Sequence, residues 1–365
     1  MNLFLASINM GYVESIRRAS ISFSIFFLIF VAQACASGSE WDQGMPKHHT
    51  TEGFRNYQIV EDAPSLGFGF YWRRFISSFS SPDVPKSHIL TEKNAMVLYK
   101  AFNDENTITW IGQSTLLIKI NGKIILTDPF FTKYASPLPI GPPRYVEPGL
   151  SPENLPTIDI LLVSHNHYDH LDADFIESLD NKDHIQVFVP LELKSFFSER
   201  NYKHVHELDW YEAESIYNIR FTALPTVHYS GRGFGDKNKS LWCSWAISSS
   251  SGQYYFIGDS AYSPTIFKEI GKKFAGFDLA MVTIGTYGNR KYGVNNHTSP
   301  EEAVTIGKEI NAKALLGIHW GTIDLSEEDP WEPPKRFAEA AKKSGYSPED
   351  IWIFKIGETR KLPGN

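Results

Sequence analysis

The sequence predicts an α+β protein in which layers of β-sheet are covered by helices on their outer faces. Two observations carry this prediction. Short runs rich in branched aliphatic and aromatic residues recur from residue 107 to residue 354, and turn residues bound them. Segments with serine caps and proline at the first helical position are interspersed among these runs, which indicates helices. The chain of 365 residues is 42% hydrophobic, so it can bury a large core, as one big domain or two modest ones.

The expected elements follow from these local signals. Asparagine followed by glycine at residues 121–122 is typical of a two-residue hairpin turn, and residues 248–252 are expected to form another hairpin loop. Ser263 and Ser299, each followed by proline, are expected to cap helices. The expected strands cover residues 107–111, 115–120, 123–127, 158–163, 186–189, 219–223, 241–247, 254–257, 279–283, 314–318 and 351–354. The expected helices cover residues 173–179, 191–200, 264–274, 300–311 and 333–344.

The N-terminal segment, residues 1–36, is expected to be a signal peptide. Two arginines precede an apolar run over residues 21–31, which is too short to span a bilayer comfortably. An Ala-Gln-Ala cleavage pattern follows, and Cys35 directly after it resembles a bacterial lipobox. We expect export to the periplasm or the envelope membrane if the protein is bacterial. Lipidation of Cys35 and an uncleaved membrane anchor are the alternatives.

Residues 37–94 are expected to form an N-terminal arm, and residues 95–365 a catalytic domain. Within the arm, six apolar residues recur at helical spacing, with arginines and serines on the opposite face. Such a stripe can form an amphipathic helix that contacts a membrane. It can equally pack onto the main domain, because aromatic stripes are usually buried. The stripe consists of Phe68, Tyr71, Trp72, Phe75, Ile76 and Phe79.

Charge and cysteine content exclude several classes of protein. The formal net charge of −7 argues against a nucleic-acid partner, which usually requires a basic excess. The two cysteines, Cys35 and Cys243, cannot build a disulfide framework or a thiolate zinc cluster. Any metal must therefore be held by histidine and aspartate, and Cys243 is expected to be a lone buried thiol within a strand.

A six-residue loop after the strand expected at 158–163 carries three histidines and one aspartate. Its sequence is His-Asn-His-Tyr-Asp-His at residues 165–170. Neutral imidazole and carboxylate are ligands that zinc accepts at roughly 2.0–2.2 Å. The end of a buried strand is also where a rigid sheet can hold polar ligands at the surface of a core. We therefore predict a two-metal hydrolytic centre rather than a polar loop with incidental histidines, since each unpaired buried imidazole would need its own partner.

Three further candidate ligands follow other apolar runs. His228, Asp259 and His319 are each the first strong ligand after an expected strand, so the strand ends would converge on one edge. A single residue of this kind is more often a turn residue or a capped carboxylate. The repeated placement predicts that all three join the histidine-rich loop.

Residues 165–170 match the H-x-H-x-D-H signature of the metallo-β-lactamase superfamily, and more of the chain resembles the N-acylphosphatidylethanolamine-hydrolysing phospholipase D family. The similar segments cover about residues 95–362 in the family's order. His-Thr-Ser-Pro-Glu-Glu-Ala at 297–303 and His-Trp-Gly-Thr at 319–322 are far more specific than the superfamily signature. The resemblance implies a four-layer αβ/βα sandwich, with two mixed sheets flanked by helices.

The resemblance also implies roles for the site residues. It assigns His165, His167 and His228 to one Zn²⁺, Asp169, His170 and His319 to a second, and Asp259 to both. It places Tyr168 and His297 against the substrate phosphodiester and head group.

Three residues around this set carry expectations from the sequence itself. His297 precedes a capped helix, where an imidazole beside the positive helix end suits a phosphate contact, the alternative being a surface cap. Gln113, in a turn after a strand, is expected to line the substrate pocket. Asp128 is expected either to orient a ligand histidine or to cap a turn.

The expected reaction is zinc-dependent phosphodiester hydrolysis. Two zinc ions about 3.5–4 Å apart would lower the pKa of a shared water and generate the attacking hydroxide. We expect Asp169, Asp259 and His297 to be catalytic, with the two aspartates orienting that hydroxide. The resemblance implies an N-acylphosphatidylethanolamine substrate at a membrane surface, and phosphatidic acid and an N-acylethanolamine as products. A hydrolase of another phosphodiester or a lactone is the alternative, as is an envelope lipoprotein with a structural metal. The sequence leaves a homodimer open.

Overall fold

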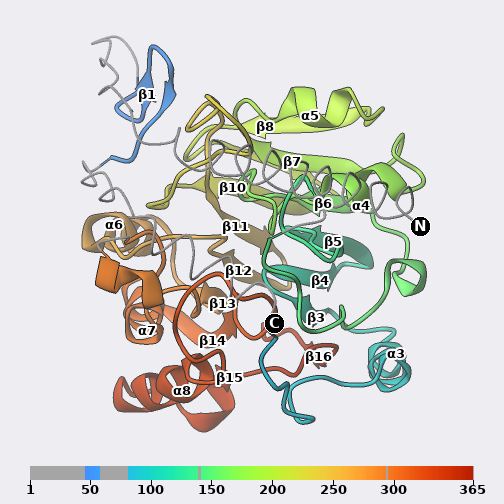
Figure 1. Ribbon diagram of the computed structural model, residues 1–365, viewed down its shortest axis with the longest axis vertical. Helices are drawn as coiled ribbons and strands as arrows, with labels where there is room; N and C mark the ends of the chain where they lie inside the picture. The colour runs from blue at the N-terminus through green and yellow to red at the C-terminus, as the bar shows by residue number, and fades with distance from the viewer. Residues whose placement is uncertain (1–45, 58–80, 139–140, 293–294, 365) are drawn as a thin grey trace, which may run out of the picture.

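Two seven-stranded sheets form the centre of the protein, and helices flank them (Figure 1). The computed structural model describes residues 46–57, 81–138, 141–292 and 295–364. Each sheet has an antiparallel half and a parallel half. The predicted α+β architecture with two mixed sheets flanked by helices is confirmed.

The first sheet has the strand order β16-β3-β4-β5-β6-β7-β8. Strands β5 to β8 pair in parallel, so their connections must cross over, and a short helix lies in each of the connections from β6 to β7 and from β7 to β8. The strands are β3 (Thr107–Gly112), β4 (Thr115–Ile120), β5 (Lys123–Thr127), β6 (Ile160–Leu162), β7 (Gln186–Pro190), β8 (His204–Leu208) and β16 (Thr359–Lys361). The helices are α4 (Ala173–Ser178) and α5 (Lys194–Ser198).

The second sheet has the order β15-β14-β13-β12-β11-β10-β9. Its parallel half runs from β12 to β15, and three longer helices form the crossovers. The strands are β9 (Ala213–Ile216), β10 (Ile219–Leu224), β11 (Ser244–Ser249), β12 (Gly252–Phe256), β13 (Phe277–Thr283), β14 (Ala312–Ile318) and β15 (Ile351–Trp352). The helices are α6 (Pro264–Lys273), α7 (Pro300–Glu309) and α8 (Pro333–Lys343). Ser263 and Ser299 cap α6 and α7 as predicted, and Ser299 forms a capping box with Glu302.

The alternation of side chains along the strands explains how the layers are joined. In β4, Leu116 and Ile118 belong to the large core cluster that also contains Phe221 and Trp245 of the second sheet. Leu117 points the other way, into a smaller cluster under the helices on the outer face of the first sheet. Both faces of this strand are therefore buried, which explains its continuous hydrophobic sequence.

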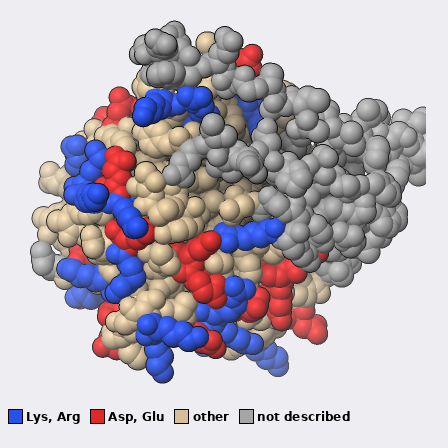
Figure 2. Space-filling view, turned by 90° about the vertical axis from the view of Figure 1, so that its left-hand side faces the viewer, with Lys and Arg blue, Asp and Glu red and all other residues tan. Residues whose placement is uncertain are grey.

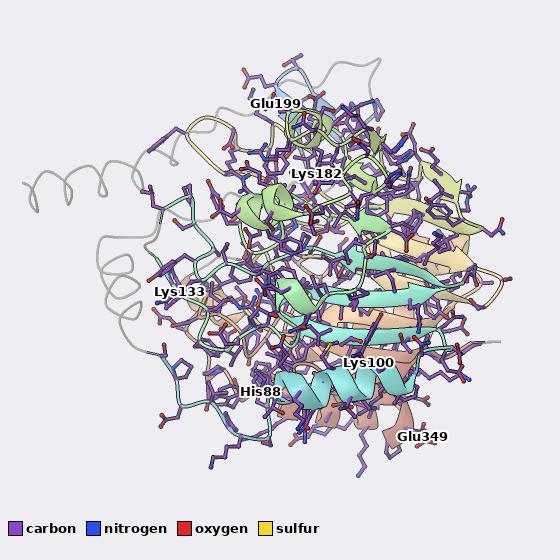
Figure 3. The ribbon with its side chains drawn as sticks, turned by 90° about the vertical axis from the view of Figure 1, so that its right-hand side faces the viewer. His88, Lys100, Lys133, Lys182, Glu199 and Glu349 are labelled. Carbon is purple, nitrogen blue, oxygen red and sulfur yellow. The ribbon has the colours of Figure 1, made fainter. Side chains whose placement is uncertain are left out.

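Helix α3 (Glu92–Ala101) covers part of the outer face of the first sheet. Figure 3 shows α3, which carries Lys100, lying beside strands of this sheet, with His88 on the segment that leads into the helix. Leu90 N donates to Ile356 O at 2.9 Å, and Ile356 N donates to His88 O at 2.9 Å. The end of the expected N-terminal arm is thus hydrogen-bonded to the segment that leads into β16. The aromatic stripe at 68–79 and the expected signal peptide lie outside the described residues.

Several elements differ from the sequence-based expectation. Strands β8, β9 and β16 and helix α3 were not expected, because these elements are short or half exposed and have little hydrophobic periodicity. The strand expected at 241–247 begins only at Ser244, since Leu241 N and Cys243 N donate to Leu191 O and Ser164 O instead. Cys243 is a buried free thiol, as predicted, but it precedes the strand.

The described surface is polar and mixed in charge. Figure 2 shows basic and acidic side chains interspersed over the described part of one face. Within the ranges that the structure describes, none of the helices combines the length and apolar character of a membrane span.

Candidate metal centre

The ends of strands from both sheets bring the predicted ligands together. The histidine-rich loop follows β6 of the first sheet, while the remaining ligands follow β10, β12 and β14 of the second sheet. Six of the seven predicted metal ligands are buried at this junction, as is His297, while the seventh, His167, is partly exposed. The buried residues are His165, Asp169, His170, His228, Asp259, His297 and His319. The convergence expected from strand-end positions is therefore observed.

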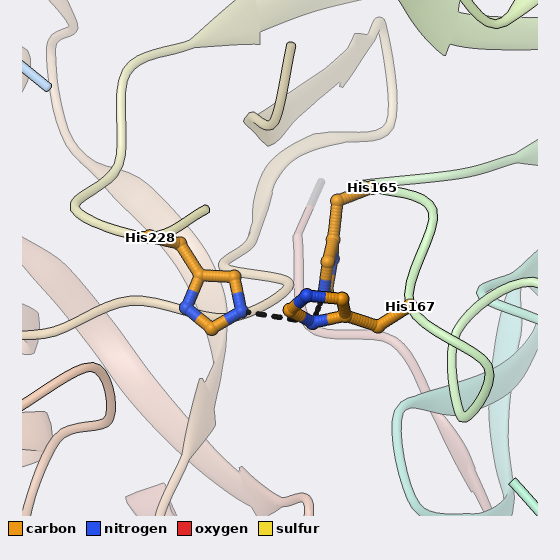
Figure 4. Close-up of side chains that lie close together, drawn as sticks. All are labelled: His165, His167 and His228. Carbon is orange, nitrogen blue, oxygen red and sulfur yellow. Dashed lines mark hydrogen bonds between the residues drawn. The ribbon is translucent and has the colours of Figure 1, made fainter. Parts of the chain in front are cut away.

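Three imidazoles form the first cluster (Figure 4). Nε2 of His165 lies 2.9 Å from Nδ1 of His167, and Nε2 of His228 lies 3.2 Å from the same nitrogen. Zinc ligands at about 2.0–2.1 Å in tetrahedral geometry would be separated by about 3.3–3.4 Å. The three nitrogens therefore fit a common metal ion with little movement.

A second cluster contains Asp169, His170 and His319. Oδ2 of Asp169 lies 3.4 Å from Nε2 of His170 and 3.3 Å from Nε2 of His319. The two imidazole nitrogens are themselves 3.3 Å apart. This set also matches the spacing of ligands around a single ion.

Asp259 lies between the two clusters. Its Oδ2 is 3.9 Å from Nε2 of His165 and 3.7 Å from Nε2 of His228 in the first cluster. The same oxygen is 3.1 Å from Nε2 of His170, and Oδ1 is 3.4 Å from Nε2 of His319, both in the second cluster. One carboxylate thus reaches both sets of donors.

The electrostatics of the junction favour a bound cation. Burial and neighbouring imidazoles lower the pKa of His165 and His167 well below the usual value, so these rings are neutral, the form that binds metal. Burial by itself would lower the pKa of His170, but Asp259 and Asp169 raise it well above the usual value. In the described part of the chain, the ion-pair partners of these two aspartates are histidines. The carboxylates therefore draw positive charge into the site, which protons or a metal ion can supply.

The imidazoles are held from outside by polar groups that fix their tautomers. Oδ2 of Asp128 accepts from Nδ1 of His170 at 2.6 Å, the contact expected of a residue that orients a candidate ligand histidine. Oγ of Ser164 lies 2.9 Å from Nδ1 of His165 and donates to Asp128 at 2.6 Å. Sequence reasoning missed Ser164, although its position directly before the first ligand was a usable signal.

Two further contacts had no signal in the sequence. Nδ1 of His228 lies 3.0 Å from the main-chain oxygen of Asn296, and Nδ1 of His319 lies 3.3 Å from Oγ1 of Thr286. The Asn296 contact uses a carbonyl that every residue has, so its residue type could not reveal it. These contacts aim Nε2 of each ring at the junction.

The backbone at two site residues is in the left-handed region that non-glycine residues rarely adopt. His319 has φ of 60° and Gln113 has φ of 52°. His319 N donates to Gln113 O at 3.0 Å, and Gln113 N donates to Oγ1 of Thr322 at 2.9 Å. The surrounding contacts thus hold a costly conformation at the end of β14, as is typical of functional sites.

The three residues predicted to contact the substrate have different surroundings in the structure. Nδ1 of His297 is 3.7 Å from Oδ2 of Asp259 and has no hydrogen-bond partner among the described residues. Gln113 donates through Nε2 to Oδ2 of Asp169 at 2.9 Å, so its amide contacts a candidate ligand. Tyr168 donates its hydroxyl to Arg232 O at 2.6 Å, and the Arg232 guanidinium stacks 3.9 Å from its ring. Substrate contacts by these residues stay predictions.

One residue at the exposed side of the site was not anticipated. The ring of Tyr229 lies 4.4 Å from the ring of His167 and 4.9 Å from that of His228, yet 37% of the residue is exposed. Its position directly after a predicted ligand was the available signal.

The fold and this donor set define a metal-dependent hydrolase of the metallo-β-lactamase fold. The family model described as "Beta-lactamase superfamily domain" matches residues 123–320. The chain belongs to this superfamily and, within it, to the family of N-acyl-phosphatidylethanolamine-hydrolyzing phospholipases D.

Two relatives carry that name. The chain is 37% identical over 238 residues to N-acyl-phosphatidylethanolamine-hydrolyzing phospholipase D 1 of Caenorhabditis elegans, covering 62% of this chain and 67% of the relative. It is 36% identical over 259 residues to the mitochondrial enzyme of that name from Saccharomyces cerevisiae, covering 69% of this chain and 55% of the relative. The chain thus matches only just over half the length of the yeast protein.

Among solved structures, the fold is similar to that of Igni18, a metallo hydrolase from the archaeon Ignicoccus hospitalis. The TM-score is 0.54 at 17% identity, over 71% of this chain and 99% of the archaeal chain. At this identity, the similarity shows the fold alone.

Proposed function

We propose that the protein is a zinc-dependent phosphodiesterase of the phospholipase D type, which hydrolyses N-acylphosphatidylethanolamine to an N-acylethanolamine and a phosphatidic acid. The observation that carries the proposal is the position of Asp259, whose carboxylate lies within 3.1–3.9 Å of imidazoles in both donor clusters. A site of this form suits two ions that act on one substrate oxygen. The names of the worm and yeast relatives support the choice of lipid.

The proposed cofactor is a pair of zinc ions. Clusters of three imidazole and carboxylate donors suit zinc, which does not require a thiolate ligand. When bound, the ions supply Lewis-acid chemistry, polarising the phosphoryl group and lowering the pKa of water towards neutrality. One ion would be held by His165, His167 and His228, the other by Asp169, His170 and His319, with Asp259 contributing to both.

The remaining chemistry falls to side chains of the chain. A water oxygen bonds to phosphorus while the bond from phosphorus to the ethanolamine oxygen breaks, and that oxygen takes a proton. Asp169 and Asp259 accept hydrogen bonds from the attacking water and orient it. Burial lowers the pKa of His297 to about 3, so a neutral ring faces the substrate and donates a hydrogen bond to a phosphoryl oxygen. Gln113 keeps the Asp169 carboxylate in place through its 2.9 Å hydrogen bond.

We further propose that the enzyme is exported and works at a membrane surface. The support is the export pattern in residues 1–36, the aromatic stripe in residues 68–79 and the insolubility of a diacyl substrate in water.

The test is a product assay on the purified full-length chain. Protein loaded with zinc is incubated with vesicles containing N-acylphosphatidylethanolamine, and the lipid products are identified by mass spectrometry alongside a metal count. We expect about two zinc ions per chain, release of N-acylethanolamine and phosphatidic acid, and loss of turnover after chelation that zinc restores. A matched His319→Ala variant should be inactive. Hydrolysis of soluble diesters or lactones without release of N-acylethanolamine would reject this substrate in favour of the alternative hydrolase.

A further inference from the structure

A small hairpin near the N-terminus touches the metal centre. Its strands are β1 (His49–Thr50) and β2 (Gly53–Phe54), and it lies outside residues 123–320, which the superfamily model matches. It is the blue element at the edge of the molecule in Figure 1. Asn56 follows β2 and is hydrogen-bonded to the main chain of His228.

The two hydrogen bonds of Asn56 hold both main-chain polar groups of this candidate ligand. Nδ2 of Asn56 donates to His228 O at 2.9 Å, and Oδ1 of Asn56 accepts from His228 N at 3.1 Å. A primary amide is well suited to this task, since it presents one donor and one acceptor side by side. Across 172 residues of sequence, one side chain therefore fixes the backbone at His228.

The sheet itself does not supply these contacts to His228. Strand β10 ends at Leu224, and Val227 still pairs with Ala261, in the segment after β12, because its oxygen accepts from Ala261 N at 2.8 Å. One residue later, the main-chain partners that the structure gives His228, within the described ranges, come from Asn56. The ring is fixed separately, through the contact of Nδ1 with the Asn296 oxygen. Ring and backbone are thus held by groups from two distant segments.

The hairpin is also attached to the protein through the two histidines at its start. Nε2 of His48 lies 2.5 Å and Nε2 of His49 lies 2.8 Å from the two carboxylate oxygens of Asp209. The ring of His48 also stacks on Trp210, with centroids 4.3 Å apart. This attachment gives Asn56 a rigid base.

The hairpin also contacts the far end of the loop that begins at His228. Phe54 N donates to Asn238 O at 2.8 Å, and a Cβ on Gly53 would lie 2.2 Å from the same oxygen, so the backbones are in close contact. Asn238 N in turn donates to Ser230 O at 2.9 Å, closing the loop on itself. The hairpin therefore holds both ends of residues 228–239.

We propose that Asn56 is a positioning residue of the metal centre and that the hairpin, residues 46–57, is part of the catalytic unit. The inference rests on the proposed metal-dependent function. By fixing the His228 main chain, Asn56 keeps Nε2 of His228 at 3.2 Å from Nδ1 of His167, in place for the ion of the first cluster. Removing such a support from a metal ligand typically weakens metal affinity by about 10–100-fold.

The experiment uses three full-length variants, and zinc binding is measured by competition with a chromophoric chelator. Asn56→Ala removes both hydrogen bonds, whereas Asn56→Asp keeps an acceptor for His228 N but sets a carboxylate against His228 O. Asn103→Ala, at an exposed asparagine after α3, is the matched control. We expect Asn56→Ala to lower the affinity for one of the two zinc ions by about 10–100-fold and to leave the affinity for the other unchanged. Asn56→Asp should also lower the affinity for one ion, and Asn103→Ala should bind both ions with wild-type affinity.

Thermal unfolding of the metal-free proteins separates positioning from simple stability. The proposal would be overturned if the variants lost stability and their affinity for both zinc ions fell equally. It would also be overturned if both Asn56 variants kept wild-type zinc affinity. If Asn56→Ala does not fold, the selective loss in Asn56→Asp decides the matter. Because zinc alone is the probe, a wild-type protein that binds two ions without cleaving N-acylphosphatidylethanolamine would reject the lipid and leave the Asn56 result intact.

Discussion

Replacing Asp128 by Asn would test how the metal centre is held from outside. The Asp128 carboxylate accepts from Ser164 N at 2.7 Å through Oδ1, and from Ser164 Oγ and His170 Nδ1 at 2.6 Å through Oδ2. If the oxygen of the new amide stays on Ser164 N, its NH₂ group faces His170 Nδ1. The His170 ring must then carry its proton on Nε2, the nitrogen that faces the metal site, and that nitrogen can no longer bind a metal.

The size of the effect follows from these contacts. A hydrogen bond to a charged group contributes about 1.5–3 kcal/mol, and the variant loses one such bond to His170. Loss of a carboxylate that supports a metal-binding histidine typically reduces metal affinity by about 10–100-fold, or about 1.4–2.8 kcal/mol. We therefore expect a loss of this order for the ion held by Asp169, His170 and His319, with a matching fall in turnover.

Asp159→Asn is the matched control for this measurement. Asp159 also accepts a backbone N–H, from Ile124 at 2.9 Å, and pairs with Lys123 at 2.8 Å, but it precedes β6 rather than following β5. The Asp159→Asn variant should lose some stability and keep wild-type zinc affinity. Zinc affinities are read by chelator competition and turnover by release of N-acylethanolamine. An Asp128→Asn protein with wild-type zinc affinity and turnover would refute the reasoning.

Three further predictions follow from the packing and from the sequence. Burial raises the pKa of the Cys243 thiol well above its usual value. In a Cys35→Ser variant, where Cys243 is the remaining cysteine, the folded protein should therefore resist a thiol reagent until urea unfolds it; rapid labelling of the native protein would contradict this. Gly258→Ala would place a Cβ 2.4 Å from Cβ of Ser164, at a residue whose φ is 60°. It should lower the free energy of unfolding, measured by urea titration, by about 1–3 kcal/mol, and an unchanged midpoint would contradict this. Replacing Trp72 and Phe75 by Ser should weaken vesicle flotation without changing metal content, whereas loss of folding would favour the packing alternative for the aromatic stripe.

Local features of the sequence were sufficient to predict much of the fold. The hairpin at Asn121-Gly122 has φ of 53° and 74°, the positive values that this turn requires and that this residue pair tolerates. The caps at Ser263 and Ser299 bond to backbone groups three residues away, so the signal and its partner share one short segment. Buried strands such as β4 were equally clear, because both of their faces need apolar side chains.

Elements at the edges of the sheets were harder to predict. Strand β8 leaves most of its residues partly exposed, so its sequence lacks the hydrophobic pattern of an inner strand. The start of β11 depends on Leu191 and Ser164, whose carbonyls capture the backbone of residues 241–243 before the strand begins. Information of this kind is held by distant segments and is invisible in a short window of sequence.

The sequence by itself determined the chemistry of the centre, because the residue types in the histidine-rich loop and at the strand ends restrict the site to histidine and aspartate ligands. Only the tertiary structure decided the geometry: that Asp259 lies between two donor clusters, that Asp128 fixes His170, and that Asn56 holds His228. The physical reason is that a ligand's type is a property of its side chain. Its position depends on hydrogen bonds, many of them to main-chain atoms, that segments far apart in the sequence make only after the two sheets have packed.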